Sequence, residues 1–247
     1  MLALVSDKIK IRKLCKSFHV SGRDFAVFEN LSLDIPLTGI TAVVGASGCG
    51  KTTLLRILGG LEKADGGTIH MPDGIKVGVV FQEPRLMPWL TARHNITFSR
   101  QDLPETDVRA LIDMVGLRGF EQAYPHQLSG GMQHRAALAR ALAYNPDMIL
   151  MDEPFAALDY FTRDTLQKEL LHIHTVSQKG IVLITHHIDE ALLLGRKIIV
   201  LGHKTVKKQV DLTGFAYPRD LFREDVICVK QDILQHIAHN DITNPGG

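Results

Sequence analysis

The sequence predicts an α/β fold with a mainly parallel β-sheet, an antiparallel β subdomain and a helical insertion. Short apolar runs are typical of strands buried on both faces, and four of them recur along the chain, at 40–44, 148–151, 181–184 and 197–201. Apolar and polar residues alternate from residue 8 to about 38, which predicts antiparallel strands. The composition is helical from about 90 to 144, and a C-terminal stripe at helical spacing predicts a helix over about 221–239.

A glycine-rich loop follows the first apolar run. Gly45 to Thr52, with the sequence Gly-Ala-Ser-Gly-Cys-Gly-Lys-Thr, fits the phosphate-binding pattern G-x-x-x-x-G-K-[ST] between a strand and a helix. Glycines let backbone N–H groups point at phosphate oxygens, and the helix N-terminus adds its dipole. Lys51 would neutralise the β- and γ-phosphates, and the Thr52 hydroxyl would bind Mg²⁺. The predicted nucleotide-binding residues of this loop are Gly45, Ala46, Ser47, Gly48, Cys49, Gly50, Lys51, Thr52 and Thr53.

Two further segments carry groups that could act on a bound nucleotide. Leu128 to Gln133, with Ser129, Gly130 and Gly131, begins a long helical run, so its hydroxyl and backbone N–H groups could bind a second anion or simply cap the helix. Asp152 and Glu153 end a buried apolar run. Asp152 could hold Mg²⁺ through water, and Glu153 could polarise the water that attacks the γ-phosphate, or the pair could be a plain strand-end turn.

These motifs together resemble the ATP-binding subunit of an ATP-binding-cassette (ABC) transporter, in the family's order and over nearly the whole chain. The matching segments are the Walker A loop 45–52, Gln82 of the Q-loop, the signature 128–133, the Walker B strand 148–153, the D-loop Ala157-Leu158-Asp159 and the switch-histidine segment Thr185-His186. The resemblance implies a P-loop NTPase core of the ABC ATPase fold, spanning residues 5–240 as one nucleotide-binding domain. It also implies ATP and Mg²⁺ as cofactors, and ATP hydrolysis coupled to transport.

The resemblance also implies a role for each matching residue. Catalytic roles fall on Glu153, His186 and Gln82, while Mg²⁺ contacts fall on Thr52, Gln82 and Asp152. ATP contacts extend to Asp159, Ser129, Gly130 and Gly131, of which Ser129 and Gly131 reach the ATP bound by a second copy. The signature departs from the family at Met132, where Gln is usual. An aromatic residue stacks on adenine in this family, and Phe18 is the best match, with Phe25 and Phe28 as rivals.

A narrower resemblance connects the chain to importer ATPases for nitrate, sulfonates, taurine and related small compounds. Pro88-Trp89 after the Q-loop carries it, with the 153–159 segment and Tyr217-Pro218-Arg219. The segment after the Q-loop faces the permease in this family, so Trp89 is either a permease contact or an ordinary packed aromatic. The resemblance implies a second copy of the chain, transmembrane permease subunits and, indirectly, a solute-binding protein as partners, at the cytoplasmic face of the membrane.

Composition limits the other functions. Lys and Arg total 28 against 27 Asp and Glu, which argues against nucleic acid as a partner. No stretch approaches the ~18 apolar residues of a membrane span.

Three cysteines suggest no disulfide framework, and the helix N-terminus near Cys49 predicts an acidic thiol. No cysteine or carboxylate cluster of metal-ligand spacing accompanies His172, His174, His186 and His187, which favours surface or packing roles for these histidines. The alternatives left open are a soluble ABC-type ATPase, as in iron–sulfur assembly, and an export or lipoprotein-release motor.

Overall fold

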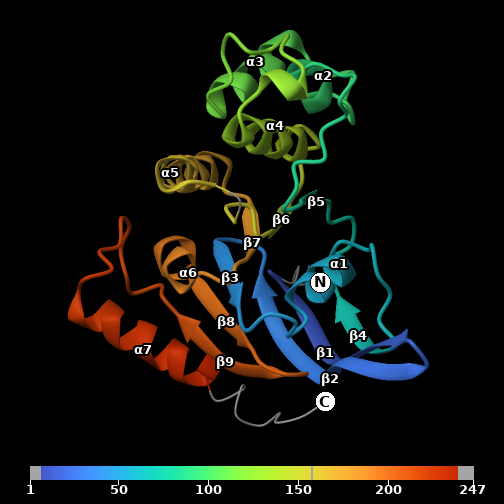
Figure 1. Cartoon of the computed structure of the whole chain (residues 1–247), viewed down its shortest axis with the longest axis vertical. Helices are drawn as coiled ribbons and strands as arrows, with labels where there is room; N and C mark the ends of the chain where they lie inside the picture. The colour runs from blue at the N-terminus through green and yellow to red at the C-terminus, as the bar shows by residue number, and fades with distance from the viewer. Residues whose placement is uncertain (1–6, 157, 239–247) are drawn as a thin grey trace, which may run out of the picture. The chain divides into compact units, whose positions relative to one another are not determined.

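The computed structural model describes residues 7–156 and 158–238, which form two compact units (Figure 1). The first unit comprises the described residues up to Ile75 and from Gly180 onward, and the second comprises Lys76–Lys179 apart from residue 157. Ala157 of the predicted D-loop and the outermost residues of the predicted domain, 5–6 and 239–240, lie outside the described residues. In the part of the chain that is described, no helix is long and apolar enough to cross a membrane.

The first unit contains an antiparallel layer and a mostly parallel layer. The antiparallel strands are β1 (Lys8–Val20), β2 (Arg23–Pro36) and β4 (Gly66–His70). The second layer has the order β7 (Gly180–Ile184), β3 (Ile40–Val44), β8 (Lys197–Leu201) and β9 (Val206–Asp211). Strand β3 pairs in parallel with β7 and β8, whereas β9 is antiparallel to β8. The predicted antiparallel strands and parallel core strands are therefore confirmed.

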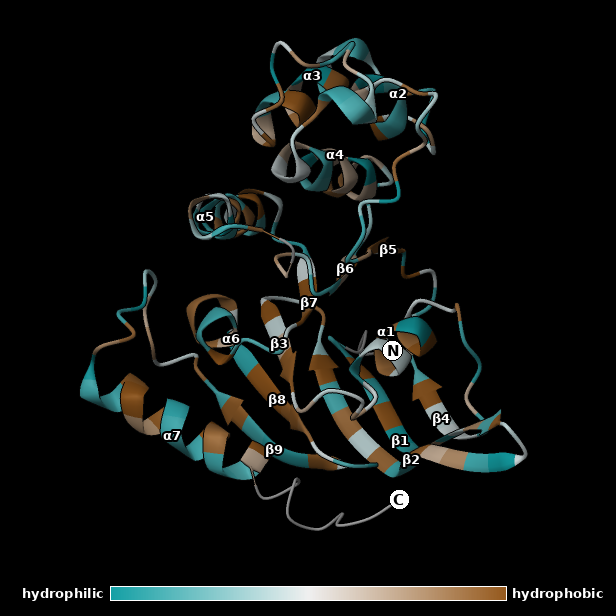
Figure 2. Ribbon diagram, in the orientation of Figure 1, coloured by the Kyte–Doolittle hydropathy of each residue, from teal (hydrophilic) through white to brown (hydrophobic). Residues whose placement is uncertain are grey.

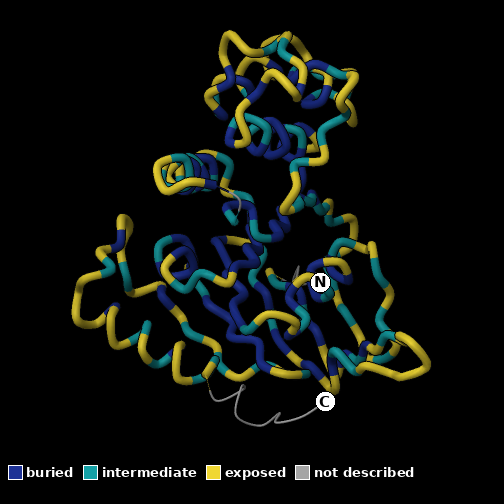
Figure 3. Tube along the Cα trace, viewed as in Figure 1, coloured by how far each residue is buried: buried dark blue, intermediate teal, exposed yellow. Residues whose placement is uncertain are grey.

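Strands β3 and β7 are buried at every position, as their continuous apolar sequences predict (Figure 3). Three helices accompany these strands: α1 (Lys51–Leu58), α6 (Ile188–Leu194) and α7 (Glu224–Ala238). A cluster of apolar side chains from β3, β8, α6 and α7 forms one core (Figure 2). Helix α7 begins at Glu224 rather than near 221, because residues 221–223 form turns in which Asp220 accepts the N–H of Phe222.

The second unit is mainly helical. Its two strands, β5 (Val77–Val80) and β6 (Met148–Asp152), pair in parallel. The helices are α2 (Ala92–Ile96), α3 (Glu105–Met114), the 3₁₀ turn η1 (Pro125–Gln127), α4 (Gly130–Ala143) and α5 (Tyr160–Ser177). Helices α2 to α4 occupy the range in which the sequence predicts a helical insertion.

Candidate active site

The phosphate loop in the first unit forms a cradle at the start of α1. Gly50 precedes the helix with φ 100°, and among the described residues no side chain caps α1 and no acidic residue lies in its first turn. The positive end of the helix dipole is therefore suited to an anion. A Cβ on Gly50 would lie 2.7 Å from Val27 Cγ1 and 2.8 Å from Phe28 Cε1. Both the backbone angle and the space require glycine here.

Lys51 is folded into this loop. Only 6% of its surface is exposed, and its ammonium group donates to the carbonyl oxygens of Gly45 and Ala46, both at 2.9 Å. A Cβ on Gly45 would lie 2.4 Å from Leu201 O, so the loop packs tightly against the end of β8. The structure thus holds a positive charge where the sequence predicts phosphate binding.

The expectation of an acidic thiol at Cys49 is wrong. Cys49 is 7% exposed, and this burial raises its pKa by more than the nearby Lys51 charge lowers it. A thiolate loses its hydration in such a place, so the neutral thiol is favoured despite the helix N-terminus.

The predicted switch histidine, His186, lies in the same unit as the phosphate loop, between β7 and α6. The turn is fixed by Thr185, which is buried, donates its hydroxyl proton to Glu190 and accepts the N–H of His187 at 3.0 Å. His186 itself is exposed, and its ring lies 4.0 Å from that of His187. The backbone around the histidine is therefore held while its side chain faces solvent.

The predicted Walker B carboxylates follow β6 in the second unit. Asp152 is buried at the end of the strand, and Glu153 comes next with φ 46°. A positive φ is uncommon outside glycine, and such backbone strain clusters at functional sites. The structure therefore adds an observation at Glu153 that the sequence motif alone could not supply.

The Q-loop residue Gln82 is exposed, two positions after β5. The segment that follows is held by Arg140 of α4, which donates to Pro84 O at 2.9 Å and to Arg85 O at 2.8 Å. Sequence analysis missed Arg140, because its partners are 55 and 56 positions away along the chain. The arginine connects the Q-loop segment to the helix that begins at the signature.

Within the signature, Ser129 caps α4 by accepting the N–H of Met132 at 3.3 Å. Gln133 donates to the carbonyls of Pro125 and Leu128, which fixes the turn before the helix. A Cβ on Gly131 would lie 2.6 Å from Thr162 Cγ2 of α5, whereas one on Gly130 would meet nothing within 4 Å. The capping role is thus observed, and the nucleotide contact remains a prediction.

Asp159 in the D-loop caps the next helix, α5. Its carboxylate accepts the backbone N–H groups of Phe161 and Thr162, both at 3.1 Å, and the hydroxyl of Thr162. The hydrogen bond from the Thr162 hydroxyl is the largest cause of its lowered pKa. Asp159 therefore has a structural role besides the predicted ATP contact.

The three phenylalanines proposed for adenine stacking differ in exposure. Phe28 is 1% exposed and lies against the phosphate loop, so it offers no free face. Phe18 and Phe25 are opposite each other on β1 and β2, and Phe18 is the more sheltered. The Lys16 ammonium lies 4.8 Å from the centre of the Phe18 ring and pairs with Glu62 at 2.8 Å. Lys16 escaped the sequence analysis, although it orients the ring.

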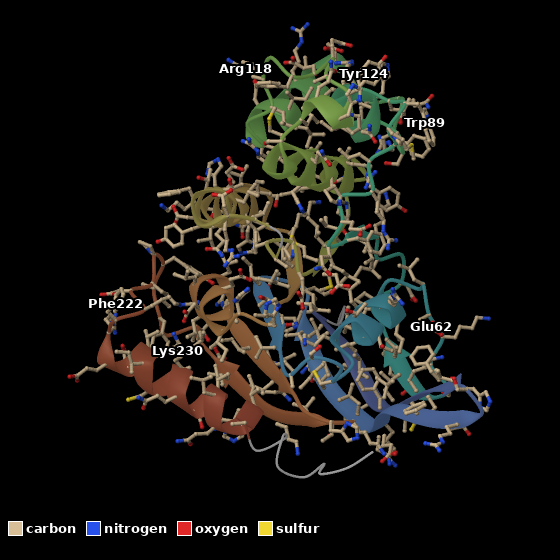
Figure 4. The ribbon with its side chains drawn as sticks, viewed as in Figure 1. Glu62, Trp89, Arg118, Tyr124, Phe222 and Lys230 are labelled. Carbon is tan, nitrogen blue, oxygen red and sulfur yellow. The ribbon has the colours of Figure 1, made fainter. Side chains whose placement is uncertain are left out.

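Trp89 is 72% exposed, which excludes the interpretation as an ordinary packed aromatic (Figure 4). The loop that carries it is shaped by Asn95, which is fully buried. The Asn95 amide donates to the carbonyls of Met87, Leu90 and Thr91, and its oxygen accepts the Met87 N–H at 2.7 Å. The sequence did not reveal this role of Asn95, because its partners are backbone groups of the same loop.

The structure brings the predicted site residues together in two groups. The phosphate loop, Phe18 and His186 belong to the first unit, and the others to the second: Gln82, Ser129, Gly130, Gly131, Asp152, Glu153 and Asp159. Of the remaining histidines, His174 Nδ1 lies 2.9 Å from Lys179 O and His172 is exposed. Within the described ranges, no three His, Cys, Asp or Glu side chains are grouped so as to hold a metal ion.

The model of the family described as ABC transporter matches residues 28–156. The chain belongs to the ABC transporter family. This ABC protein is therefore an ATPase that binds adenine nucleotide, and the predicted ABC ATPase fold is confirmed.

Relatives cover nearly the whole of this ABC protein. An uncharacterised ABC transporter ATP-binding protein of Methanocaldococcus jannaschii is 43% identical over 241 residues, which cover 92% of this chain and 90% of that protein. The aliphatic sulfonates import ATP-binding protein SsuB of Bacillus subtilis is 40% identical over 236 residues, which cover 92% of each chain. The predicted resemblance to sulfonate-type importer ATPases is confirmed.

A solved structure has the same fold. It is a dimeric ATP-binding cassette in a post-hydrolysis state, bound to ADP and Pi, with a TM-score of 0.72 and 32% identity. The match covers 84% of this ABC ATPase and all of that chain.

Proposed function

We propose that this ABC ATPase energises the import of a small sulfonate-type solute through a separate membrane permease. The observation that carries the proposal is the 40% identity to a sulfonate import ATP-binding protein over 92% of both chains. This chain also has the catalytic residues that the family resemblance implies, which are Glu153, His186 and Gln82. The relatives named above lend no support to an iron–sulfur assembly ATPase or to an export motor.

The phosphates of ATP bind the first unit in this proposal. The uncapped start of α1 and the Lys51 ammonium offer N–H donors and positive charge to the β- and γ-phosphates. Thr53 lies in the first turn of the same helix, and Phe18 stacks on adenine through its ring face. His186, exposed beside His187, contacts the γ-phosphate.

Hydrolysis uses the carboxylate that follows the Walker B strand. Glu153 polarises the attacking water, and Gln82 orients it. The backbone at Glu153 has a positive φ, a strained conformation of the kind that occurs at functional sites. Thr52, Gln82 and Asp152 supply the hydroxyl, carbonyl and carboxylate oxygens that Mg²⁺ prefers, so the donor set fits this ion. When bound, Mg²⁺ neutralises charge on the phosphates.

A second copy of the chain completes each ATP site. We assign the contact to Ser129 and Gly131, as the family resemblance implies, with Gly130 and Asp159 as further ATP-binding residues. The dimeric cassette relative supports such an arrangement. ATP binding then closes two copies, and hydrolysis opens them, because the γ-phosphate contacts are lost. Residues 5–240 act in this cycle as one nucleotide-binding domain.

The permease docks on the loop that carries Trp89. A large exposed aromatic on a rigid loop is typical of an interface anchor, and Asn95 supplies the rigidity. This partner places the chain at the cytoplasmic face of the membrane, with a solute-binding protein acting through the permease.

Complementation tests the cargo. The chain would be expressed in a bacterium that lacks the ATP-binding subunit of its aliphatic-sulfonate importer, together with the cognate permease and binding protein of this chain. We expect growth on an aliphatic sulfonate as the sole sulfur source, and none with Glu153→Gln at equal expression. Growth that fails although the purified chain hydrolyses ATP would refute the cargo and leave the ATPase assignment standing.

A further inference from the structure

The segment after β9 folds back on the helix that follows the switch histidine. Arg219, only 8% exposed, lies at the end of α6 and donates to a group of carbonyl oxygens: Leu192 (2.7 Å), Gly195, Leu212 (3.2 Å) and Phe215 (3.4 Å). The last carbonyls of a helix lack partners within the helix, and a cation there also interacts favourably with the negative end of the helix dipole. Arg219 therefore caps α6 from another part of the chain.

Tyr217 reinforces this cap. Its hydroxyl donates to Leu194 O at 2.6 Å, and its ring lies 4.3 Å from the Arg219 guanidinium carbon. An aromatic face near a cation stabilises the cation's position, more so where water is excluded. The Tyr217-Pro218-Arg219 motif therefore stabilises the C-terminal end of α6.

Helix α7 holds the other end of α6. Lys230, labelled in Figure 4, extends from α7. Its Nζ lies 2.5 Å from Oδ1 of Asp189, which is in the first turn of α6. Beneath this ion pair, Val226 and Ile233 of α7 share one apolar cluster with Ala191 of α6 and Val44 of β3, the strand that leads into the phosphate loop. Figure 1 shows α7 beside β9 and near α6, in agreement with the packing of α7 on α6, β8 and β9.

His186 is two residues before α6, and the contact between Thr185 and Glu190 transmits the position of the helix to that turn. We propose that Tyr217, Arg219 and Lys230 form a C-terminal clamp that positions α6 and, through it, His186 against the γ-phosphate. Arg219 is a positioning residue for hydrolysis and takes no part in binding ATP. The inference rests on the proposed function, because it assumes that His186 contacts the γ-phosphate.

Substitutions in the clamp should lower the turnover rate without weakening ATP binding. The phosphate loop and Lys51 make contacts to themselves and to β8 that do not involve the clamp residues. Arg219→Met should therefore lower kcat about tenfold with the KM for ATP within about twofold, which is the signature of an interaction used only in the transition state. Arg219→Lys keeps the charge but has fewer donors in a different geometry, so it should restore kcat only partly.

A double-mutant cycle with His186→Ala distinguishes positioning from general stability. If Arg219 acts through His186, Arg219→Met should cost nothing further in a His186→Ala background, because coupled residues are not additive. Lys197→Met is the matched control, since Lys197 is a partly buried cation that donates to Asp34 O at 2.7 Å from the start of β8. This control should lower the melting temperature and leave kcat within about twofold in both backgrounds.

The clamp would be overturned by a folded Arg219→Met protein with wild-type kcat, or by equal losses from this change in both backgrounds. Should Arg219→Met fail to fold, Tyr217→Phe removes only the hydroxyl bond to Leu194 O and must show the same non-additivity with His186→Ala. A His186→Ala enzyme with wild-type turnover would overturn the role of His186 and the clamp together. A slow His186→Ala enzyme beside a wild-type Arg219→Met enzyme would overturn the clamp alone.

Discussion

Single residues of the phosphate loop are specified by the space around them as much as by phosphate chemistry. Neither Gly45 nor Gly50 has room for a Cβ. Leu201 O occupies that space at Gly45, and the Phe28 ring occupies it at Gly50. The Cys49 thiol fills the space inside the curl, 2.7 Å from where a Gly45 Cβ would be. The thiol is therefore a packed group in this loop and not a reactive one.

Cys49 should accordingly react slowly with maleimide. In a Cys15→Ala, Cys228→Ala background, we expect the labelling rate to rise about tenfold per pH unit between pH 7 and 9 with no plateau, because the raised pKa leaves little thiolate. MgATP should slow the reaction further by covering the loop. A variant with only the exposed Cys228 is the control and should label faster at pH 7. Rapid labelling of Cys49 at pH 7 would contradict its burial.

Sequence patterns predicted the site residues that lie close together along the chain. The phosphate loop is a continuous segment, and Asp152 and Glu153 are neighbours in the chain, so a short motif is enough to predict each of them. Arg140, Asn95 and Arg219 act on backbone carbonyls that only the folded chain brings close. Backbone carbonyls have no sequence signature, which is why the structural roles of these three residues could not be predicted.

At the scale of elements, Asp34 on β2 joins strands of both layers. Its carboxylate lies 2.6 Å from Arg12 Nη1 and 2.8 Å from Lys8 Nζ on β1, while its carbonyl accepts from Lys197 of β8. The Arg12 hydrogen bond, followed by that of Lys8, lowers the pKa of Asp34 to about 2. The charged form is therefore favoured by folding.

This depressed pKa predicts an acid-dependent loss of stability. The stabilisation is complete above the ordinary pKa of 3.8 and is lost as pH falls toward about 2, where folded Asp34 is protonated. Asp34→Asn should lower the free energy of unfolding by roughly 1 to 2 kcal/mol at pH 7 and by about half of that at pH 3. Urea titrations at both pH values measure the difference, with exposed Asp73→Asn as the control. An equal loss at pH 3 and pH 7 would contradict the assignment.

The loop with Trp89 is the element that we expect to report permease docking. Trp89 is the only tryptophan in the chain, so its emission should shift to the blue when the cytoplasmic-loop peptide of the matching permease covers it. Trp89→Ala should abolish coupled transport, because losing an aromatic anchor costs ~2 kcal/mol and weakens assembly at least about tenfold. Basal ATPase activity should be retained. Phe120→Ala, at another exposed aromatic of the same unit, should leave transport intact, and an equal loss there would refute a specific anchor.

Elements with a clear hydrophobic pattern in the sequence were predicted well. Elements that depend on pairing or packing with another segment were not. The buried strands β3, β6, β7 and β8 appear in the sequence as short apolar runs, because both of their faces are covered. Strand β9 alternates between half-buried and exposed positions and is defined by its pairing with β8, which the sequence does not encode locally. The start of α7 differed for a similar reason, since the turn at 221–223 follows the buried Arg219.

At the scale of the whole molecule, the predicted phosphate loop and the predicted carboxylates at the end of β6 belong to different units of one chain. The phosphate loop and His186 lie in the first unit, and Glu153 and the signature in the second. Each described unit contains only part of the predicted catalytic set, so the proposed mechanism depends on both units. The proposed dimer extends the same dependence to a second copy.

Glu153→Gln should separate ATP binding from hydrolysis at this scale. The neutral amide has nearly the shape of the carboxylate but cannot serve as a general base, so turnover should fall by about a hundredfold or more. Because the phosphate loop is unchanged, ATP still binds, and two copies should remain closed around it as long as the γ-phosphate persists. Sedimentation velocity with MgATP should therefore show a dimer of Glu153→Gln, and a monomer when ADP replaces ATP.

Lys51→Ala in the Glu153→Gln background is the matched control. It removes the buried ammonium that we assign to the β- and γ-phosphates, so ATP should no longer produce the dimer, while the far-UV spectrum stays that of a folded chain. A dimer that forms equally with and without ATP would show that association does not depend on the phosphate contacts. An ATPase rate near wild type in Glu153→Gln would instead assign the general base to another residue, and the positive φ at Glu153 would then reflect only the turn before Pro154.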